Sequence, residues 1–324
     1  MSSTLPHETL RRMIALADRA PSNHNSQPWR WRRTPAGLEL HEDRTRRLPA
    51  ADPFGRSLVI SCGAALHHLQ VAAGALGWET EVERVPEAPS STLLARVELR
   101  RGAASAHAEA ELRAIEERCT DRRRFTSWPV PDDRLHHLAG VASAYGTRAV
   151  PLLSVTERFR AELLVGRAGE RQATDPSIER EQQEWLDHSA VDGIPSTVLP
   201  RQTTTVSEGG HHGFATGVLD DPERLIEGSD GLIVLCDVAD DVGSWLSAGE
   251  ALSALWLAAT VQGLSVVPLS QVVEVAETRQ ALQHDVLGGS AHPLLLVRIG
   301  WQEIGRSELP RTSRRPVDDV LDQR

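Results

Sequence analysis

The chain has few cysteines and few aromatic residues. Its three cysteines, Cys62, Cys119 and Cys236, are odd in number and form no CxxC pair. A disulfide framework is therefore not expected, and reduced thiols in a cytoplasmic protein are predicted. Eight tryptophans outnumber four phenylalanines and one tyrosine. Buried tryptophan usually serves the core, so this composition alone indicates no function.

Several short motifs and targeting signals are also missing. The first twenty residues carry acids among their apolar residues, unlike a signal peptide. No apolar run has the length of a membrane span. No GxGxxG, GxSxG or P-loop sequence occurs, which argues against a Rossmann nicotinamide site. Three histidine pairs lack metal-ligand spacing, although the last lies in a glycine-rich loop where it could touch substrate: His67-His68, His136-His137 and His211-His212.

Excess positive charge is absent too. The formal net charge is −10, which argues against nucleic-acid and membrane-surface partners because both need basic patches. A local basic pocket for a phosphate remains compatible with it. With 40% hydrophobic and 25% charged residues, the chain has the composition of a globular protein.

An internal repeat organises the sequence. SCGAALHHLQVAAGALGW (61–78) and SAGEALSALWLAATVQGL (247–264) align without gaps at an offset of 186 and match at 8 of 18 positions. Both are apolar nearly all round, so both are expected to be buried helices. The alternative is convergence of two alanine- and leucine-rich helices, but the flanking segments also correspond.

The flanks predict the same strand, helix, strand order twice. The predicted strands precede and follow each helix, at 37–43, 93–99, 231–237 and 293–299. This order favours an α+β protein of two fused halves, 1–105 and 106–324, whose central helices pack together as in a homodimer. An insertion at about 160–222, without counterpart in the first half, is expected to be functional or to form a lid.

A run of polar residues follows the first predicted helix (8–19). Residues 19–31 read RAPSNHNSQPWRW, and proline at 21 disfavours helix in the residue before it. The polar run 22–27 suits a ligand rich in donors and acceptors, or else it is a capped turn without a ligand. The candidate ligand-binding residues here are Ser22, Asn23, His24, Asn25, Gln27 and Trp29.

Three later segments also contain candidate ligand-binding residues. EERCTDRRRFTSWPVPDD (116–133) holds four arginines within seven residues, against an acidic background. Arginine suits a phosphate dianion because its planar donors bind two oxygens at once, although a solvated basic turn would look similar. GLSVVPLSQ (263–271) follows the second repeat helix, and PRTSRRP (310–316) lies near the C-terminus.

Together these segments resemble the nitroreductase superfamily, an FMN-dependent group, and more closely its Acg family, over essentially the full length. The resemblance implies a nitroreductase-like fold and an FMN cofactor. It implies phosphate contacts from Arg118, Cys119, Thr120 and Arg122, although one extra residue before Phe125 shifts the alignment by a position. It also implies a flavin-facing loop at Pro268, Leu269, Ser270 and Gln271, and further phosphate contacts from Arg314 and Arg315, with Arg311 a weaker match.

The two halves carry complementary parts of that pattern. The first half holds the PSNHN turn but begins too late to hold an arginine motif. The second half holds RCTDRRR, and where a second turn would lie it reads GVASAYGTRAVPL. One complete FMN site per chain is therefore expected, in a monomer that is a pseudo-dimer or in a weak homodimer.

Three functions follow as alternatives. The first is an oxidoreductase that takes electrons from NAD(P)H and reduces a nitro compound, a quinone or a similar small acceptor. The second is a flavin-sequestering or storage protein whose insertion covers the FMN. The third is a pseudo-dimer without a cofactor. No side chain stands out as a catalytic acid or base, and no metal site is expected. In the first case the cofactor would do the chemistry and the protein would orient it.

Overall fold

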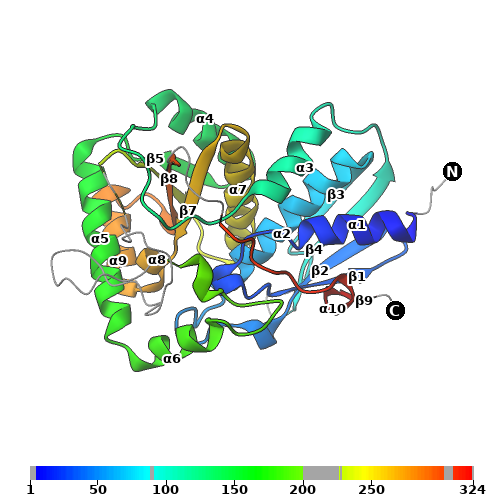
Figure 1. Ribbon diagram of the computed structural model, residues 1–324, viewed down its shortest axis with the longest axis horizontal. Coiled ribbons are helices and arrows are strands. Elements are labelled where there is room, and N and C mark those ends of the chain that lie inside the picture. Colours follow the sequence, from blue (N-terminus) through cyan, green and yellow to red (C-terminus); the bar gives the residue numbers. More distant parts are fainter. Residues whose placement is uncertain (1–4, 88–90, 200–225, 227, 303–308, 323–324) are drawn as a thin grey trace.

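The protein is made of two α+β units that lie side by side (Figure 1), which confirms the predicted class. A computed structural model describes residues 5–87, 91–199, 226, 228–302 and 309–322. The end of the expected lid and the pair His211-His212 lie outside the described residues.

The first unit is a five-stranded sheet of order β3-β4-β2-β1-β9. Its strands are β1 (Trp29–Arg33), β2 (Gly37–Glu42), β3 (Trp78–Arg84), β4 (Leu93–Arg101) and β9 (Leu321–Asp322). Its helices are α1 (His7–Ala17), η1 (Asn23–Asn25), η2 (Arg44–Arg46), α2 (Arg56–Ala75), α3 (Ala108–Glu117) and α10 (Val317–Val320). The apolar faces of α1 and α2 pack with the buried residues of this sheet into one core.

The second unit is a four-stranded sheet of order β5-β6-β8-β7 with helices on both faces. Its strands are β5 (Arg148–Pro151), β6 (Gly231–Asp237), β7 (Leu264–Leu269) and β8 (His292–Trp301). Its helices are α4 (Asp132–Ser143), α5 (Val155–Ala173), α6 (Pro176–Trp185), η3 (Ser196–Val198), α7 (Val242–Val261), α8 (Gln271–Glu274), α9 (Ala276–Ala281) and the π-helical η4 (Leu282–Val286).

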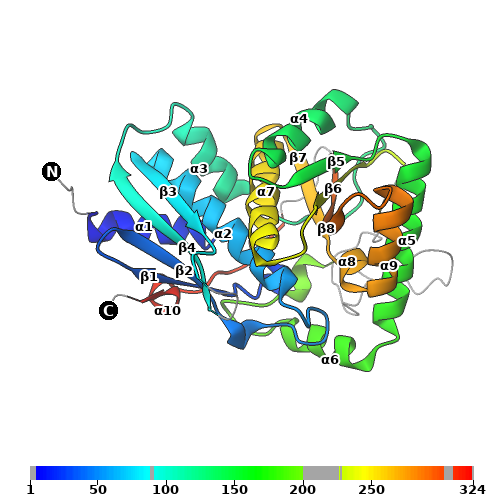
Figure 2. The ribbon, with the colours of Figure 1, turned by 180° about the vertical axis from the view of Figure 1, so that it is seen from behind.

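Helices α2 and α7 lie against each other between the two sheets (Figures 1 and 2). Two glycines allow this approach. A Cβ at Gly63 would lie 2.1 Å from the Leu246 carbonyl oxygen, and one at Gly249 would lie 2.0 Å from the Ile60 carbonyl oxygen. Helix α2 is long and apolar enough to cross a membrane, but 83% of that stretch is buried here, as in the core helix of a soluble protein.

The repeat predicted the core elements well. Both central helices occur, and β2, β4, β6 and β8 lie at the four predicted strand positions. Helix α1 ends at Ala17, two residues before the predicted end. Helix α5 begins at Val155, earlier than the insertion was placed, because Ser154 and Glu157 form a capping box there.

The C-terminus returns to the first sheet. Strand β9 pairs in parallel with β1, with Leu321 beside Trp31. This strand follows directly on helix α10 and was not expected from the sequence. Val320 and Leu321 are buried in the first core, which explains why the chain end is held there. The sheets therefore do not divide strictly at a boundary near residue 105.

Candidate functional site

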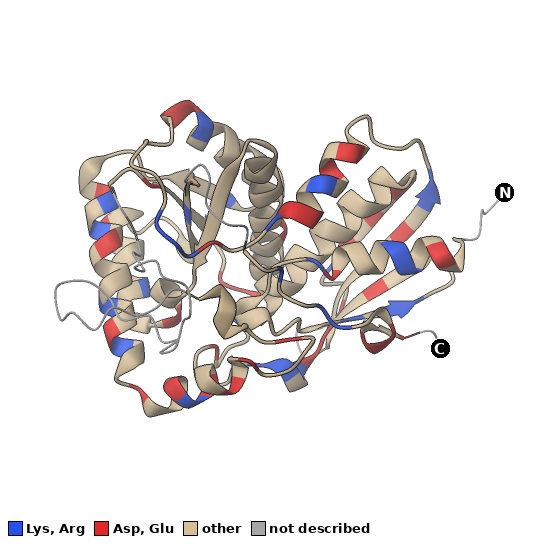
Figure 3. Ribbon diagram, viewed as in Figure 1, with Lys and Arg blue, Asp and Glu red and all other residues tan. Residues whose placement is uncertain are grey.

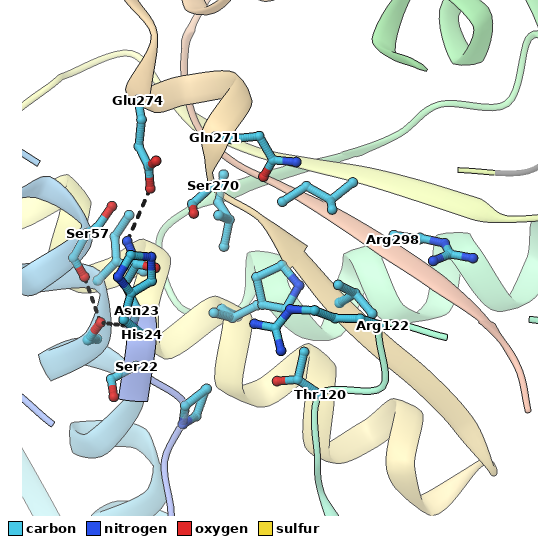
Figure 4. Close-up of a pocket in the computed structure, with 18 of the residues that line it drawn as sticks. Ser22, Asn23, His24, Ser57, Thr120, Arg122, Ser270, Gln271, Glu274 and Arg298 are labelled. Atoms are coloured by element: carbon cyan, nitrogen blue, oxygen red, sulfur yellow. Dashed lines mark hydrogen bonds between the residues drawn. The ribbon is translucent and has the colours of Figure 1, made fainter. Parts of the chain in front are cut away.

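Two adjoining cavities lie where the halves meet. The larger measures about 1240 Å³ including its open mouth, and the smaller about 760 Å³. Pro21, Ser22, His24, Thr120 and Arg122 line both. The larger cavity is walled by the η1 turn, α2, α7 and the β7–α8 corner (Figure 4), and the smaller by the arginine-rich coil after α3 and the C-terminal coil.

The η1 turn has an unusual backbone. His24, Asn25 and Gln27 have φ values of 51°, 53° and 48°, in the left-handed region that residues other than glycine rarely adopt. Such conformations persist only where the surroundings fix them, and they gather at functional sites. The Ser22 hydroxyl accepts from the Gln27 amide at 3.0 Å, and the Ser61 hydroxyl accepts from the Asn23 amide at 3.2 Å.

Many polar groups of the turn form hydrogen bonds with the protein itself. The Asn25 side chain donates to the carbonyl oxygens of Gly193 (2.9 Å) and Ser313 (3.2 Å). The Gln27 side chain donates to the Val191 carbonyl at 2.9 Å, and its oxygen accepts from the Arg315 amide at 2.8 Å. The polar run was interpreted as ligand-binding, but several of its groups bind the insertion and the C-terminal coil.

The smaller cavity holds a cluster of arginines, which we call the arginine cluster: Arg19, Arg118, Arg311 and Arg314. Figure 3 shows basic segments on the coil after α3 and on the C-terminal coil, near the middle of the molecule. All four guanidinium groups donate to backbone carbonyls, for example Arg118 to the Arg19 oxygen at 2.6 Å and Arg314 to the Asp18 oxygen at 2.8 Å. Within the described part of the chain, none of the four pairs with a carboxylate.

Repulsion between the arginines exceeds the compensation, which comes from Asp18 acting on Arg314 without a salt bridge. Burial and the neighbouring charge of Arg314 lower the pKa of Arg118 to about 9, and burial together with Arg19 lowers the pKa of Arg314 to about 10. The Nε of Arg118 is buried and has no hydrogen-bond partner among the described residues. Its guanidinium stacks over Trp256, 4.7 Å from the ring centre. A buried cation without a paired carboxylate is costly, so the position of Arg118 suits an anionic ligand.

The corner between β7 and α8 forms another wall of the larger cavity. Pro268, Leu269, Ser270 and Gln271 all line it. Glu274 lies one helical turn beyond Ser270, and its carboxylate accepts from the Asn23 amide group at 3.1 Å (Figure 4) and from the Gln172 amide group at 2.6 Å. Burial raises the pKa of Glu274 to about 7, with a smaller contribution from Asp52.

His24 completes the junction of the cavities. Burial lowers the pKa of His24 to about 3, and the nearby Arg122 acts in the same direction. The imidazole is therefore neutral at physiological pH. It cannot act as a cation there, so positive charge in the site comes from arginine.

The structure brings most of the predicted site residues to these cavities. They are Ser22, Asn23, His24, Asn25, Arg118, Cys119, Thr120, Arg122, Pro268, Leu269, Ser270, Gln271 and Arg314, together with the weaker candidate Arg311. Three others lie elsewhere. Trp29 is fully buried in the first core and donates to Asp18 at 2.8 Å. Gln27 and Arg315 bind each other and line neither cavity.

Several residues that line the larger cavity were not predicted from the sequence. Glu274 follows Gln271 by three residues, so helical spacing would have placed both on one face. Arg298 interrupts the apolar strand β8, where it pairs with Asp230 at 2.6 Å and lies over Phe125. A charge in a buried strand was a visible signal. Gln172, on α5, had no local signal. No group of side chains in the described residues could hold a metal ion.

Comparison with known proteins identifies relatives over nearly the whole chain. "Putative NAD(P)H nitroreductase Rv3131" of Mycobacterium tuberculosis is 36% identical over 97% of this chain and 91% of its own length. "Putative NAD(P)H nitroreductase acg" of the same organism is 31% identical over 97% of this chain and 95% of its own. A nitroreductase with bound FMN from Bacteroides fragilis superposes with a TM-score of 0.41 at 14% identity, covering 63% of this chain and 94% of that one. No family model matches the chain. The two relatives confirm the resemblance read from the motifs: the chain belongs to the Acg group of the nitroreductase family.

Proposed function

We propose that this chain binds one FMN across the two cavities and passes electrons from NAD(P)H to a nitro compound, a quinone or a similar small acceptor. The observation that carries the proposal is the arginine cluster, because it gathers four cationic donors around the buried Arg118, none of them in a salt bridge with a carboxylate of the described residues. The names of the relatives support the NAD(P)H-dependent activity.

In this proposal the smaller cavity takes the phosphate. Arg118 and Arg314 provide the most buried charge, and Thr120 lines both cavities. Each charge-assisted hydrogen bond contributes about 1.5–3 kcal/mol. The unpartnered Nε of Arg118 is a donor that a phosphate oxygen would satisfy. Cys119, Arg122 and Arg311 extend the same wall.

The larger cavity takes the flavin ring. Bound flavin supplies hydride and electron transfer, and the protein supplies orientation and polar contacts. The backbone amides of Ser270 and Gln271, at the start of α8, are candidate donors to the ring edge. The turn at Ser22–His24 lines the same cavity and adjoins α8 through the bond from Asn23 to Glu274. Apolar side chains of α7, Leu252 and Trp256, line the floor.

We further propose that the chain is an internal duplication of halves 1–105 and 106–324. Residues 186 apart play equivalent roles at the crossing of α2 and α7. Gly63 abuts Leu246 and Gly249 abuts Ile60, which are reciprocal contacts under that offset. His67 and Ser253 are themselves equivalent, and their side chains meet at 2.7 Å. Reciprocal contacts of this kind characterise a two-fold interface, here within one chain.

A second candidate function has its own support. Gln172, Gln182, Leu199, Ile194 and Val198 come from the expected insertion and line the cavities. A segment that covers the site in this way would restrict exchange of flavin, nicotinamide and acceptor. Sequestration of FMN with little reductase activity is therefore the alternative. In either case we propose a cytoplasmic protein that acts as a monomer or a weak homodimer.

Spectroscopy distinguishes the two. Purified protein reconstituted with FMN is expected to be yellow and to retain the flavin through gel filtration. Under anaerobic conditions NADPH or NADH should bleach it within seconds if it is a reductase. Flavin that stays oxidised with both nicotinamides would favour sequestration. Protein that does not retain FMN at all would contradict both functions.

A further inference from the structure

The carboxyl group of Glu274 lies in the wall of the larger cavity. It is half-buried, and in the described residues no arginine or histidine pairs with it. Carboxylates withdrawn from water for a structural role are ordinarily stabilised by a paired cation. The polar groups that contact it are the amides of Asn23 and Gln172 and the hydroxyl of Ser270.

These contacts fix the carboxyl group from three segments. Asn23 lies in the η1 turn, Gln172 in helix α5 and Ser270 at the β7–α8 corner. Both amides donate, one to each carboxylate oxygen, while a hydroxyl can donate or accept. Ser270 can therefore accept from the protonated acid and donate to the ionised one. Figure 4 shows Glu274 directed toward Asn23, at the side of the cavity bounded by Ser270.

We propose that Glu274 holds the proton that a bound acceptor receives during its reduction in this cavity. This inference rests on the proposed function, since it needs reduced flavin as the hydride source. It assigns an acid where the sequence suggested none.

Reduction of a quinone to a hydroquinone takes up a hydride and one proton. A hydride from reduced flavin forms an O–H bond at one quinone oxygen, and the electron pair displaced through the ring leaves a phenolate at the other. Glu274 gives its proton to that phenolate and becomes a carboxylate. The quinone becomes a hydroquinone, the flavin is oxidised, and a proton from water restores Glu274.

The surrounding charges agree with a neutral acid near pH 7. Burial is the main cause of the raised pKa of about 7, and Asp52 adds like-charge repulsion. Arg56 donates to the neighbouring Val273 carbonyl at 3.5 Å but is paired with Asp240. Arg122, Arg298 and His24 line the same cavity, and His24 is neutral. An acid with a pKa near the working pH is suited to proton transfer.

The first test needs no turnover. Infrared spectra of the protein without nicotinamide or acceptor are recorded from pH 5 to pH 9 for the wild type and for Glu274→Gln. The difference should contain a protonated-carboxyl band that disappears with a midpoint near pH 7. Subtracting the variant separates Glu274 from Asp18, whose pKa burial also raises to about 7. Absence of such a band would overturn the proposal.

The second test compares two acceptors. Photoreduced, FMN-loaded protein is reoxidised by a benzoquinone, which needs a proton, or by ferricyanide, which takes electrons only. The wild-type quinone rate should fall about tenfold per pH unit above pH 7. Glu274→Gln should lower the quinone rate about 10²–10⁴-fold at pH 6, remove the pH dependence and leave the ferricyanide rate unchanged. A wild-type pH profile in Glu274→Gln would overturn the proposal.

Control variants show whether the effect on the pH dependence belongs to Glu274 alone. Glu277→Gln removes an exposed carboxylate three residues away that pairs with Arg171 at 3.1 Å, and it should behave as the wild type. If Glu274→Gln does not fold, Gln172→Leu replaces it. Loss of that donor should move the infrared midpoint upward, and an unchanged midpoint would overturn the proposal. Protein that binds no flavin would instead refute the proposed function, while the infrared titration would still report on Glu274.

Discussion

Replacing Arg118 with methionine should weaken the binding of FMN but not that of riboflavin. Arg118 is 6% exposed, lies among three other arginines and has a buried Nε without a partner in the described residues. If that group binds a phosphate oxygen, one charge-assisted hydrogen bond contributes about 1.5–3 kcal/mol. The dissociation constant for FMN should then rise about 10- to 150-fold. Riboflavin has no phosphate and should be affected less than about twofold.

The assay is a fluorescence titration of apo protein with each flavin at fixed ionic strength. Methionine keeps an apolar stem beside Trp256, over which Arg118 lies. The lost bond to the Arg19 carbonyl costs about 1 kcal/mol, and relief of repulsion with Arg314 offsets part of it. Arg113→Met removes the same charge from an exposed helical ion pair and serves as control. Equal weakening of both flavins, or of neither, would refute the phosphate assignment.

Three further predictions concern stability. Gly249→Ala places a Cβ 2.0 Å from the Ile60 oxygen and should lower the free energy of unfolding by about 3 kcal/mol or more. In the control Gly74→Ala, the new Cβ meets nothing within 4 Å, and the free energy of unfolding should rise by about 0.5–1 kcal/mol. Urea titrations that rank the two variants the other way round would contradict the packing of α2 and α7. Glu250 is fully buried and accepts from Arg84 at 2.7 Å, so Glu250→Ala should lower the free energy of unfolding by about 3–5 kcal/mol in urea titrations. The double variant with Arg84→Ala should lose less than the sum of the two single variants, and an additive loss would show that the pair is uncoupled. Because the pKa of Glu274 is raised from 4.5 to about 7, the folded state holds that proton more tightly than the unfolded state. The resulting stabilisation, at most about 3 kcal/mol, is complete below pH 4.5 and lost as the pH rises to 7. The free energy of unfolding from urea titrations should therefore differ less between pH 5 and pH 8 in Glu274→Gln than in the wild type, and an equal difference would argue against the shift.

The sequence predicted the central elements because their signals are local and repeated. The apolar helices and flanking strands are regular segments whose burial follows from composition, and their recurrence at one offset fixed their pairing. The arginine-rich stretch after α3 was visible in the sequence, since four arginines interrupt an acidic chain. Two of them, Arg118 and Arg122, line the cavities, whereas Arg123 pairs with Asp121 at 2.8 Å. Cooperation between distant segments was harder to predict, yet the turn at Asn23 and the stretch at Thr120 do meet.

The missed features depend on tertiary partners. Gln27 and Trp29 belong to a polar and aromatic run, and nothing local distinguishes a side chain that faces a ligand from one that holds the turn or fills the core. Gln172 reaches Glu274 only because α5 packs against α8. Strand β9 depends on where the C-terminal coil ends in space. Each of these requires the packed structure, not the sequence pattern.

The account depends on one FMN lying across both cavities, and diffraction from crystals of the FMN complex tests this most directly. We expect density for the phosphate within hydrogen-bond distance of Arg118 and Arg314. The ring should lie between the turn at Ser22–His24 and the corner at Pro268–Gln271. FMN bound elsewhere, or with its phosphate outside the arginine cluster, would contradict the account.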